Sequence, residues 1–490
     1  MSSRAPGVHH TDAALLPDPA RVIARLFLPG EELPNGRSRA SRVVARVLAL
    51  SEADVETAAA GVIEDFSCRH KDFIRLLAAH ASTISSHLQA AIPMSQARSL
   101  LMGASFTAEY AVEGAALCNP SAVLHPDQTG LLPGQARVAV SLRAIGEGHL
   151  SSLGFCTAVI GAGPKWTFEP RQLPVVTGAG SAAHWTREHL RAVLTDQGRI
   201  NGLTHSVLAT LPDIFTGADL EHALTLANQD LLARPGSAAT LDELRRLVAS
   251  AYEVAFAGDV ALSQQVLLPS APDESNGLED ARFVRFVNED GITDYRATYT
   301  AYDGRRIAPR LLTTLDLRTF RAHRLTGPAA HNKGMALFPR LIAGRHWSLC
   351  RSDGESNCLA TSDDGLVWGK PILIQAPEAV WEVVQLGNCG SPIETDRGWL
   401  VLTHGVGPMR TYAIGAMLLD LDDPTRVIGQ LSEPLLQGTD HERYGYVPNV
   451  VYSCGGIIHD GRLWLPYGIG DSRIGVAWAQ VDELLDAMRS

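Results

Sequence analysis

Apolar residues recur at helical spacing in two separate stretches of the chain. The first runs from about 38 to 116, where SRVVARVLAL (41–50) and KDFIRLLAAH (71–80) carry apolar residues every three or four positions. The second covers 184–256 and includes LDELRRLVASAY (241–252). Because such stripes mark one face of an amphipathic helix, both stretches are predicted to be helical.

Short runs rich in β-branched residues occupy the rest of the chain. RVAVSLRAI (137–145) and GFCTAVIG (154–161) are typical of strands, and after residue 260 similar runs alternate with NEDG, YDGR, SDDG, TDRG and HDGR. Such turn sequences between apolar runs predict hairpins. Many evenly spaced short strands are typical of a sandwich, a barrel or a propeller, and aromatic residues recurring beside the hairpins favour a propeller. The expected fold class is mainly β.

These patterns divide the chain into three regions. Residues 1–36 are polar and contain prolines, which predicts an irregular N-terminal arm. Residues 37–117 form a helical N-terminal region, and residues 118–490 form a β-propeller domain with a helical insertion at about 184–256. The helical additions are expected to shape the substrate site, to form the interface of a homo-oligomer, or both.

The composition argues against several classes of protein. A net charge of −11 disfavours general affinity for nucleic acid. The seven cysteines are scattered without a CxxC pair, which favours free thiols in a reducing cytoplasm over disulfides or a zinc site. No basic and apolar leader opens the sequence, and no apolar run reaches about 18 residues, so a cytoplasmic protein without a membrane span is expected.

One glycine-rich segment imitates a nucleotide-binding motif. VVTGAGSAAHW (175–185) fits G-x-G-x-x-A and precedes a predicted helix, as a dinucleotide-binding turn does. Pro174, however, interrupts a preceding strand of barely three residues, and no convincing second parallel strand follows. We interpret the segment as a linker into the helical insertion and keep a dehydrogenase as a remote alternative.

Two adjacent acids stand at the mouth of a predicted strand. SNGLEDARFVRF (275–286) places Glu279 and Asp280 before an apolar run, so one of them faces the interior. The simplest interpretation is a strand-edge ion pair in which Arg282 neutralises one acid and solvent the other. The alternative is a functional carboxyl group.

Further polar residues follow later predicted strands. Lys333 precedes one strand and Arg351 follows the next, His404 ends another, and Glu442 and Asp471 lie at further strand or loop ends. The inner strands of a propeller converge on a central channel, so these side chains are expected to meet there.

Taken together, these segments resemble glycoside hydrolase family 130, the mannoside phosphorylases. The resemblance covers roughly 119–160 and 260–482 and rests on five blocks in the family's order: GLEDARFVRF, NKGMALFPRLIAGRHWSLCR, GNCGSPIETDRGWLVLTHGV, YAIGAMLLDLDDPTRVIG and LWLPYGIGD. Ala281 departs from the pattern, because the family usually has proline there. The helical segments lie outside the shorter members' pattern and resemble the longer, oligomannoside-acting members.

The resemblance implies a five-bladed β-propeller with the active site in its central cavity. It implies that Asp280 is the catalytic acid, whose proton passes through the mannose 3-hydroxyl to the glycosidic oxygen. It also implies phosphate contacts by Lys333, Arg351, His404 and Arg143. The implied sugar-binding residues are Asn119, Glu279, Arg282, Tyr412, Glu442 and Asp471.

Lys333, Arg351 and His404 resemble the family's phosphate-contacting positions, and this resemblance favours phosphorolysis over hydrolysis. An inverting hydrolase needs a second carboxylate to activate water, whereas phosphate is already an anionic nucleophile that such a carboxylate repels. Arginine and lysine are the side chains that bind phosphate. The expected reaction converts a β-mannoside and inorganic phosphate into α-mannose 1-phosphate and a shortened acceptor, without a metal or an organic cofactor.

Two other functions remain open at this stage. A β-mannoside hydrolase on the same fold would need Glu442 or Asp440 as its base. A non-catalytic sugar-binding propeller would need no base at all. The acceptor and its linkage, β-1,2 or β-1,4, are also undecided, although the longer architecture favours β-1,2-linked manno-oligosaccharides.

Overall fold

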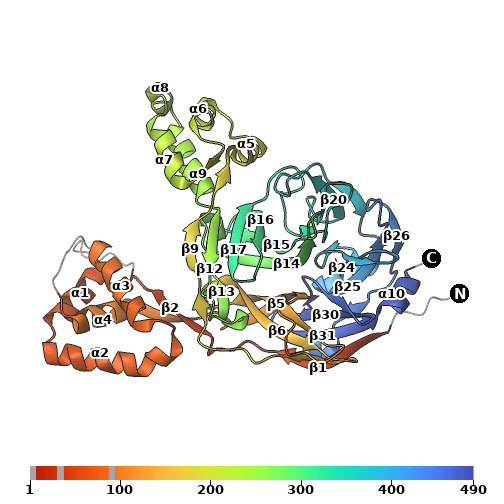
Figure 1. Ribbon diagram of the computed structural model, residues 1–490, viewed down its shortest axis with the longest axis horizontal. Helices are drawn as coiled ribbons and strands as arrows, with labels where there is room; N and C mark the ends of the chain where they lie inside the picture. Colours follow the sequence, from red (N-terminus) through yellow and green to blue (C-terminus); the bar gives the residue numbers. More distant parts are fainter. Residues whose placement is uncertain (1–6, 30–37, 88–93, 489–490) are drawn as a thin grey trace. The chain divides into compact units, whose positions relative to one another are not determined.

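The computed structural model describes residues 7–29, 38–87 and 94–488 (Figure 1). The protein is mainly β with several helices. Residues 18–114 together with 172–177 form a smaller compact unit, and the remaining described residues form a larger one.

The smaller unit contains the helices predicted for the first stretch. Ser38, Ser51 and Ser95 each precede a helix, and each hydroxyl accepts a hydrogen bond from the backbone N–H three residues later. This capping satisfies an N–H group that the first helical turn leaves free. The helices are α1 (Arg39–Ala49), α2 (Glu52–Phe66), α3 (Phe73–His87) and α4 (Gln96–Ser105), next to the antiparallel pair β2 (Val22–Leu26) and β3 (Thr107–Ala111).

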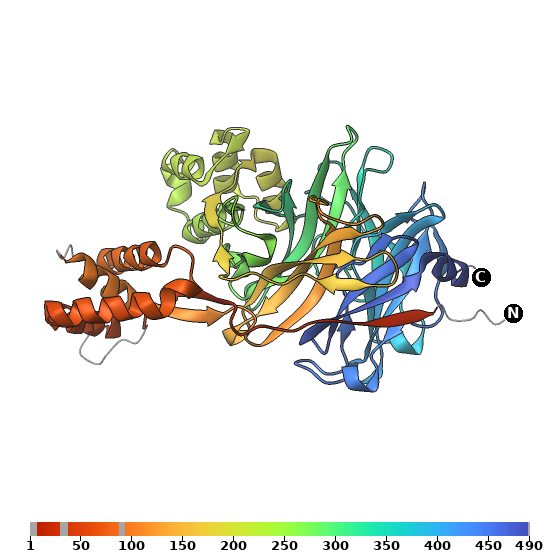
Figure 2. The same cartoon turned by 60° about the horizontal axis from the view of Figure 1, so that its bottom comes forward.

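The N-terminal arm is not irregular where it is described, so that prediction is wrong. Residues 8–15 form β1 (Val8–Leu15), which pairs antiparallel with β31 (Arg473–Gln480) at the other end of the sequence (Figure 2). Part of the arm also forms β2. The strand that pairs with β1 lies more than 450 residues away in the sequence, so no local pattern predicts this pairing. Residues 1–6 and 30–36 of the predicted arm lie outside the described residues.

Antiparallel sheets built from consecutive hairpins make up most of the larger unit. The turn sequences named above connect neighbouring strands, which confirms the predicted hairpins. The first half contains β4 (Ala116–Leu124), β5 (Ala136–Ile145), β6 (Ser151–Ile160), β14 (Gly277–Val287), β15 (Thr293–Tyr302), β16 (Ile307–Thr314) and β17 (Thr319–Arg324). The second half contains β18 (Ala336–Leu337), β19 (His346–Cys350), β20 (Asn357–Ser362), β21 (Ile372–Gln375), β22 (Gln385–Asn388), β24 (Gly398–Val406), β25 (Tyr412–Leu419), β26 (Val427–Gln430), β28 (Val451–Tyr452), β30 (Arg462–Ile469) and β31.

Buried apolar side chains fill the spaces between successive sheets. One such cluster joins the first sheet to the last, because Leu117 and Val140 share a core with Trp464 and Val476. Aromatic pairs mark two of these contacts, with centroid separations of 5.1 Å for Phe338–Trp399 and 6.0 Å for Trp166–Trp464.

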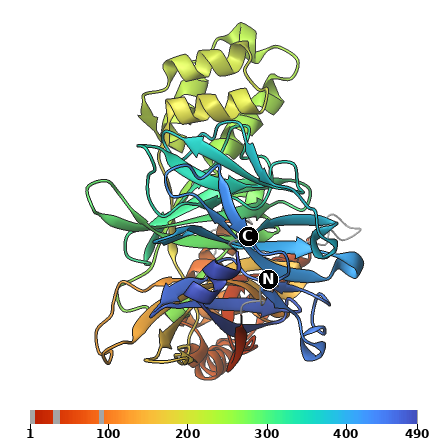
Figure 3. The same ribbon diagram turned by 90° about the vertical axis from the view of Figure 1, so that its right-hand side faces the viewer.

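The helical insertion has a hydrophobic core of its own, which includes Leu190, Val193 and Leu244. Figure 3 shows its helices as one group. They are α5 (Arg187–Asp196), α6 (Gly202–Thr210), α7 (Gly217–Thr225), α8 (Gln229–Leu232) and α9 (Ser237–Val248).

The glycine-rich segment before this insertion is not a nucleotide-binding turn. Residues 179–182 form β9 (Ala179–Ala182), which pairs antiparallel with β12 (Tyr252–Ala255). A dinucleotide-binding unit requires parallel strands joined by a crossover helix. The linker interpretation therefore agrees with the structure. Within the described part of the chain, none of the helices combines the length and the apolar character needed to span a membrane.

Candidate functional site

Asp280 lies in a β-bulge of β14. Glu279 pairs with Thr300 and Arg282 pairs with Thr298, so β14 contains one more residue than β15 between these two pairs. Asp280 itself adopts a φ of +54°, which is uncommon for a residue with a side chain. Consecutive side chains of a regular strand point to opposite faces, and a bulge changes that direction.

The bulge lets both adjacent acids reach the same guanidinium group. Nη2 of Arg143 donates to Oε1 of Glu279 at 2.7 Å, and Nη1 lies 3.6 Å from Oδ1 of Asp280. The predicted strand-edge pair with Arg282 is therefore not what the structure contains. Both acids instead face a cation from another strand, β5.

Strand β4 repeats the same local geometry. Its register shifts between Cys118 and Ser121, and Asn119 within this bulge has a φ of +50°. Asp471, in the turn between β30 and β31, has a φ of +47°. Backbone strain of this kind collects at functional sites, where the surrounding structure holds it in place.

Glu279 connects two of the predicted phosphate-binding cations. Its Oε2 accepts from Nζ of Lys333 at 2.6 Å, while Oε1 accepts from Arg143. Ser151 fixes Arg143 further by accepting from its Nε at 2.9 Å. Because Glu279 is 7% exposed, these contacts hold both cations in defined positions beside Asp280.

His404 is a neutral acceptor rather than a cation. Burial, and then the charges of Arg351 and Arg282, lower the pKa of His404 to about 3. Its Nδ1 lies 3.1 Å from the carbonyl oxygen of Asn388 and must donate to it, so Nε2 carries a free lone pair. Nη1 of Arg351 faces this Nε2 at 3.4 Å. His404 therefore orients Arg351.

Gly387 is required for this arrangement. A Cβ atom at residue 387 would lie 2.6 Å from Cε1 of His404 and 3.3 Å from Cδ of Arg351. Any other residue would displace the imidazole ring. The glycine of the GNCG segment thus makes room for the histidine and the arginine.

Arg282 lies beneath the acids and is 2% exposed. Its Nη2 donates to the hydroxyl of Tyr452 at 2.7 Å, and its Nη1 donates to the backbone oxygen of Asp280 at 3.3 Å. Arg282 therefore supports the backbone of the bulge and adds positive charge below it.

The two acids Asp280 and Asp471 have opposite electrostatic surroundings. Burial raises the pKa of Asp280, but Arg143, Lys333, Arg282 and Arg351 outweigh it and hold the pKa below its ordinary value. Burial also raises the pKa of Asp471, and this effect prevails over Arg143, so that its pKa reaches about 6. Environments that separate the pKa values of neighbouring carboxyl groups are typical of catalytic sites.

Several buried polar atoms in this cluster have no hydrogen-bond partner among the described residues. Buried polar groups are nearly always hydrogen-bonded in folded proteins, so a group of unpaired atoms indicates a place for a polar ligand. These atoms are Oδ1 of Asn119, Oδ1 of Asp280, Nε of Arg282 and Nε of Arg351.

Two predicted residues lie apart from these contacts. Glu442 accepts from the Tyr467 hydroxyl at 2.5 Å and from the backbone N–H of Thr439 at 2.9 Å, so its contacts are those of a structural residue. Tyr412 contacts the cluster through its ring, which stacks on His404 at a centroid separation of 6.2 Å and meets Tyr452 edge-on at 6.3 Å. The structure brings together Asp280, Glu279, Arg282, Arg143, Lys333, Arg351, His404 and Asp471. Asn119 follows Cys118, whose thiol is within electrostatic reach of Asp280, Arg143 and Asp471.

Two residues of the cluster escaped the sequence analysis. Asn388 donates from Nδ2 to the carbonyl oxygen of Gly334 at 2.6 Å and accepts from His404, so it links the Lys333 segment to β24. Tyr452 holds Arg282. The signal for Asn388 was its place between two glycines in GNCG, whereas VVYSC carries no comparable signal for Tyr452.

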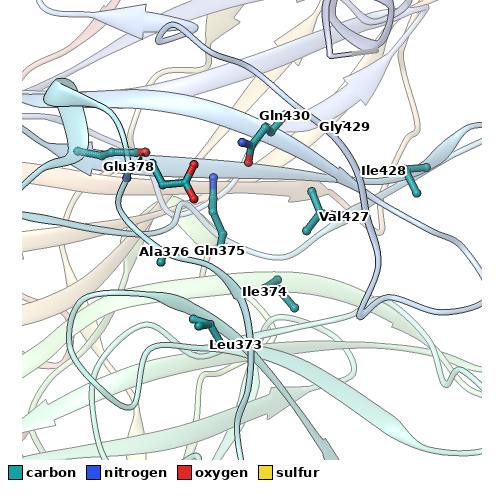
Figure 4. A pocket seen from close by; sticks show the side chains of 10 residues that line it. Leu373, Ile374, Gln375, Ala376, Glu378, Val427, Ile428, Gly429 and Gln430 are labelled. Atoms are coloured by element: carbon teal, nitrogen blue, oxygen red, sulfur yellow. Dashed lines mark hydrogen bonds between the residues drawn. The ribbon is translucent and has the colours of Figure 1, made fainter. Parts of the chain in front are cut away.

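A separate cavity of about 580 Å³ lies between β21 and β26. Figure 4 shows Gln375 and Gln430 pointing into it from these two strands, next to aliphatic side chains. None of the predicted site residues lines this cavity.

Throughout residues 7–29, 38–87 and 94–488, no group of three or more histidine, cysteine, aspartate or glutamate side chains is placed to hold a metal ion.

A family profile and the sequences of two known proteins point to the same family of enzymes. Residues 260–490 match the profile of glycoside hydrolase family 130, described as beta-1,4-mannooligosaccharide phosphorylase. A 1,2-beta-oligomannan phosphorylase of Thermoanaerobacter sp. (strain X514) is 36% identical over 231 residues, which are 46% of this chain and 75% of the relative. A beta-1,2-mannobiose phosphorylase of the same organism is 35% identical over 218 residues, 43% of this chain and 70% of the relative.

A solved structure also aligns with the chain. It is the complex of the beta-1,2-mannobiose phosphorylase from Listeria innocua with beta-1,2-mannobiose, with a TM-score of 0.44 and 20% sequence identity. The alignment covers 77% of this chain and 93% of that chain. On the sequence matches over its C-terminal half, the chain belongs to glycoside hydrolase family 130.

Proposed function

We propose that this protein is an inverting phosphorylase of β-mannosides that releases α-mannose 1-phosphate. The observation that carries the proposal is the set of cations around one buried acid. Arg143, Lys333, Arg282 and Arg351 lower the pKa of Asp280 in spite of its burial. So much positive charge beside an acid suits an anionic co-substrate such as phosphate.

The proposed substrate is a β-1,2-linked manno-oligosaccharide. Support comes from the two Thermoanaerobacter relatives, which are phosphorylases of β-1,2-linked oligomannan and mannobiose. The family profile is described by a β-1,4 activity, so β-1,4-linked mannosides are the alternative to test.

In the proposed reaction, an oxygen of phosphate attacks C1 of the terminal mannose from the face opposite the leaving saccharide. The new C1–O bond forms as the glycosidic bond breaks, which inverts the configuration at C1. Asp280 supplies the proton that the departing oxygen takes up, through the 3-hydroxyl of the mannose. Lys333, Arg351 and Arg143 bind phosphate, His404 orients Arg351, and Asn119 and Asp471 bind the sugar. Neither a metal nor an organic cofactor takes part.

The positions of the two candidate bases, Glu442 and Asp440, argue against a hydrolase. The carboxylate of Glu442 is held by Tyr467 and Thr439. Asp440 is 91% exposed at its side chain and lies 3.6 Å from Arg443. An activated water needs a free carboxylate opposite the acid.

The proposed architecture is a five-bladed β-propeller. Its support is the series of antiparallel sheets with apolar cores between neighbours, including the core shared by the first and last sheets. Pairing of β1 with β31 completes the last sheet with the N-terminal strand. We also propose a reducing, cytoplasmic location, because Cys68, Cys118, Cys350, Cys358, Cys389 and Cys454 are free thiols.

Product analysis tests the function directly. Purified protein is incubated with β-1,2-mannobiose and longer β-1,2-mannan oligomers, with and without inorganic phosphate. Phosphate-dependent release of mannose 1-phosphate is the expected result. Phosphate-independent release of free mannose would replace the proposal with a hydrolase. Absence of product from β-1,2 and β-1,4 mannosides alike would favour a sugar-binding protein.

A further inference from the structure

A second cavity, of about 420 Å³, lies where the helical insertion meets the sheet of β14 to β17. The insertion contributes Asp196 at the end of α5, Arg199 just after it, and Glu243 and Arg246 of α9. The sheet contributes the turn after β15, the start of β16 and the segment after β17. A volume of this size is within the range of small-molecule sites, about 300–1,000 Å³.

The cavity is at the same end of the strands as the catalytic cluster. Its lining includes Arg306 of the hairpin turn that follows Tyr302, and Tyr302 pairs with Gly277, three residues before Asp280. Its lining also includes His331, two residues before Lys333. Two walls of the cavity are therefore linked through the chain and through the pairing of β14 with β15 to the segments that carry Asp280 and Lys333.

Contacts within the larger unit place the insertion against this wall. Nε2 of His331 lies 3.0 Å from Oδ1 of Asp196, at the end of α5. Oδ2 of the same aspartate accepts from the hydroxyl of Thr326 at 3.0 Å and from the backbone N–H of Gly327 at 3.2 Å. The insertion is therefore anchored to the segment that leads to Lys333.

Charges around the cavity are balanced. Four arginines, Arg199, Arg246, Arg306 and Arg324, face four carboxylates, Asp196, Glu243, Asp273 and Asp303. Arg246 is paired with Glu243 at 2.7 Å, and Arg324 with Asp273 at 3.1 Å. Arg199 and Arg306 are exposed, and no hydrogen bond or ion pair joins their guanidinium groups to a side chain of the described residues. The charge of Arg306 acts on Asp303 and is one of the causes that lower the pKa of that carboxyl group. The donors of both arginines are therefore available to a ligand.

Such a lining suits a neutral molecule with many hydroxyl groups. A hydroxyl donates to a carboxylate and accepts from a guanidinium, and both hydrogen bonds are strengthened by the charge. An anion placed in the cavity would meet as many carboxylates as arginines and gain little from electrostatics. The chemistry favours an uncharged saccharide over a nucleotide or a sugar phosphate.

We propose that this cavity binds the acceptor end of longer manno-oligosaccharides, several sugar units away from the bond that is broken. The inference rests on the proposed function for the identity of the sugar. The family profile begins at residue 260, so helices α5 to α9 lie outside the matched region and their role does not follow from it. The insertion thus extends the substrate site and selects for chain length.

The kinetic test compares β-1,2-mannobiose with the tetrasaccharide at saturating phosphate. We expect the wild-type kcat/KM to rise with chain length. The double variant Arg199→Ala/Arg306→Ala should lower kcat/KM for the tetrasaccharide about tenfold more than for the disaccharide, because hydrogen bonds from charged donors are lost. Arg305→Ala is the matched control, since Arg305 is an exposed arginine of the same turn outside the cavity lining.

A binding experiment separates this inference from the proposed function. The tetrasaccharide is titrated into Asp280→Asn protein with and without the two arginine substitutions, at low and at high salt. Weaker binding to the substituted protein, by a similar factor at both salt concentrations, is expected for a neutral ligand. Equal affinity of the two proteins overturns the cavity assignment even if phosphorolysis is found. If phosphorolysis is absent but the substitutions still weaken binding, the reaction is wrong and the saccharide site stands.

Discussion

Nη1 of Arg143 lies 3.6 Å from Oδ1 of Asp280, and the guanidinium group of Arg143 is one of the cations that lower the pKa of that carboxyl group. Burial alone would raise this pKa, so the sign of the shift depends on the four neighbouring cations. In the protein without phosphate, Asp280 is therefore ionised at neutral pH. A general acid must be protonated before it can act, so Asp280 has to gain a proton during the catalytic cycle.

Binding of an anion is expected to protonate Asp280. A dianion placed beside Lys333 and Arg351 offsets their charge, so the pKa of Asp280 rises and the protein takes up a proton. Calorimetric titration with sulfate, in buffers of different ionisation enthalpy near pH 7, measures this proton uptake. Sulfate is used because, unlike phosphate, it does not change its own protonation near pH 7. Asp280→Asn should abolish the uptake, and Asp471→Asn should retain it. Uptake that disappears only in Asp471→Asn protein would identify the other acid as the proton carrier.

Asp280→Asn should slow the release of mannose 1-phosphate by about 10²–10⁴-fold, the usual effect of removing a general acid. Binding of the oligosaccharide should persist, because the amide keeps the shape of the carboxyl group. Asp440→Asn is the control, since that side chain is exposed and lies beside Arg443. Initial rates with saturating phosphate measure both. Wild-type turnover in Asp280→Asn protein would remove the catalytic assignment.

Gly387→Ala should weaken phosphate binding through His404 and Arg351. The added methyl group, 2.6 Å from Cε1 of His404, forces the ring away from Arg351. We expect the KM for phosphate to rise about tenfold or more, a loss of about 1–3 kcal/mol. Gly154→Ala in β6 is the control, because a Cβ there meets no heavy atom within 4 Å. A KM that changes equally in both variants would contradict the proposed role of Gly387.

The neutral state of His404 predicts the shape of the pH profile. Its pKa of about 3 means that it stays uncharged from pH 5 to 8, so the KM for phosphate should show no transition near pH 6.5 from this residue. His404→Phe should raise that KM by removing the acceptor for Arg351, and His404→Gln should recover part of the loss through its side-chain oxygen. A transition near pH 6.5 that vanishes in both variants would show that His404 acts as a cation.

Asp471→Asn should stabilise the protein most at high pH. The folded-state pKa of about 6 exceeds the ordinary value of 3.8, so the unfolded chain loses its proton first as the pH rises. Asp471 therefore opposes folding above pH 4, fully above pH 6, by up to about 3 kcal/mol. Urea unfolding at pH 5 and pH 8 should show the larger gain at pH 8. Asp422→Asn, at an exposed position, should show no such difference.

The local pattern of the sequence was sufficient for the helices and the hairpins, but not for β1 and β2 of the N-terminal arm. Serine caps, apolar stripes and Asp-Gly turns act over a few residues, so the helices of 38–116 and 184–256 and the hairpins after 260 could be predicted. The candidate chemistry was also visible, because acids and cations stood in recognisable blocks, from Asp280 to Asp471. Each of these signals lies within a short segment of the sequence.

Tertiary structure decided how those residues act. The bulge that turns Asp280 and Glu279 towards one arginine depends on pairing with β15, and the neutral state of His404 depends on burial and on a carbonyl group from Asn388. Glu442 looked equivalent to the other acids until its bonds with Tyr467 and Thr439 were seen. Charge state and side-chain direction depend on neighbours distant in sequence. The sequence by itself therefore determined the elements that local signals specify and the candidate groups. The packing of distant strands decided the place of β1 and the protonation and roles of those groups.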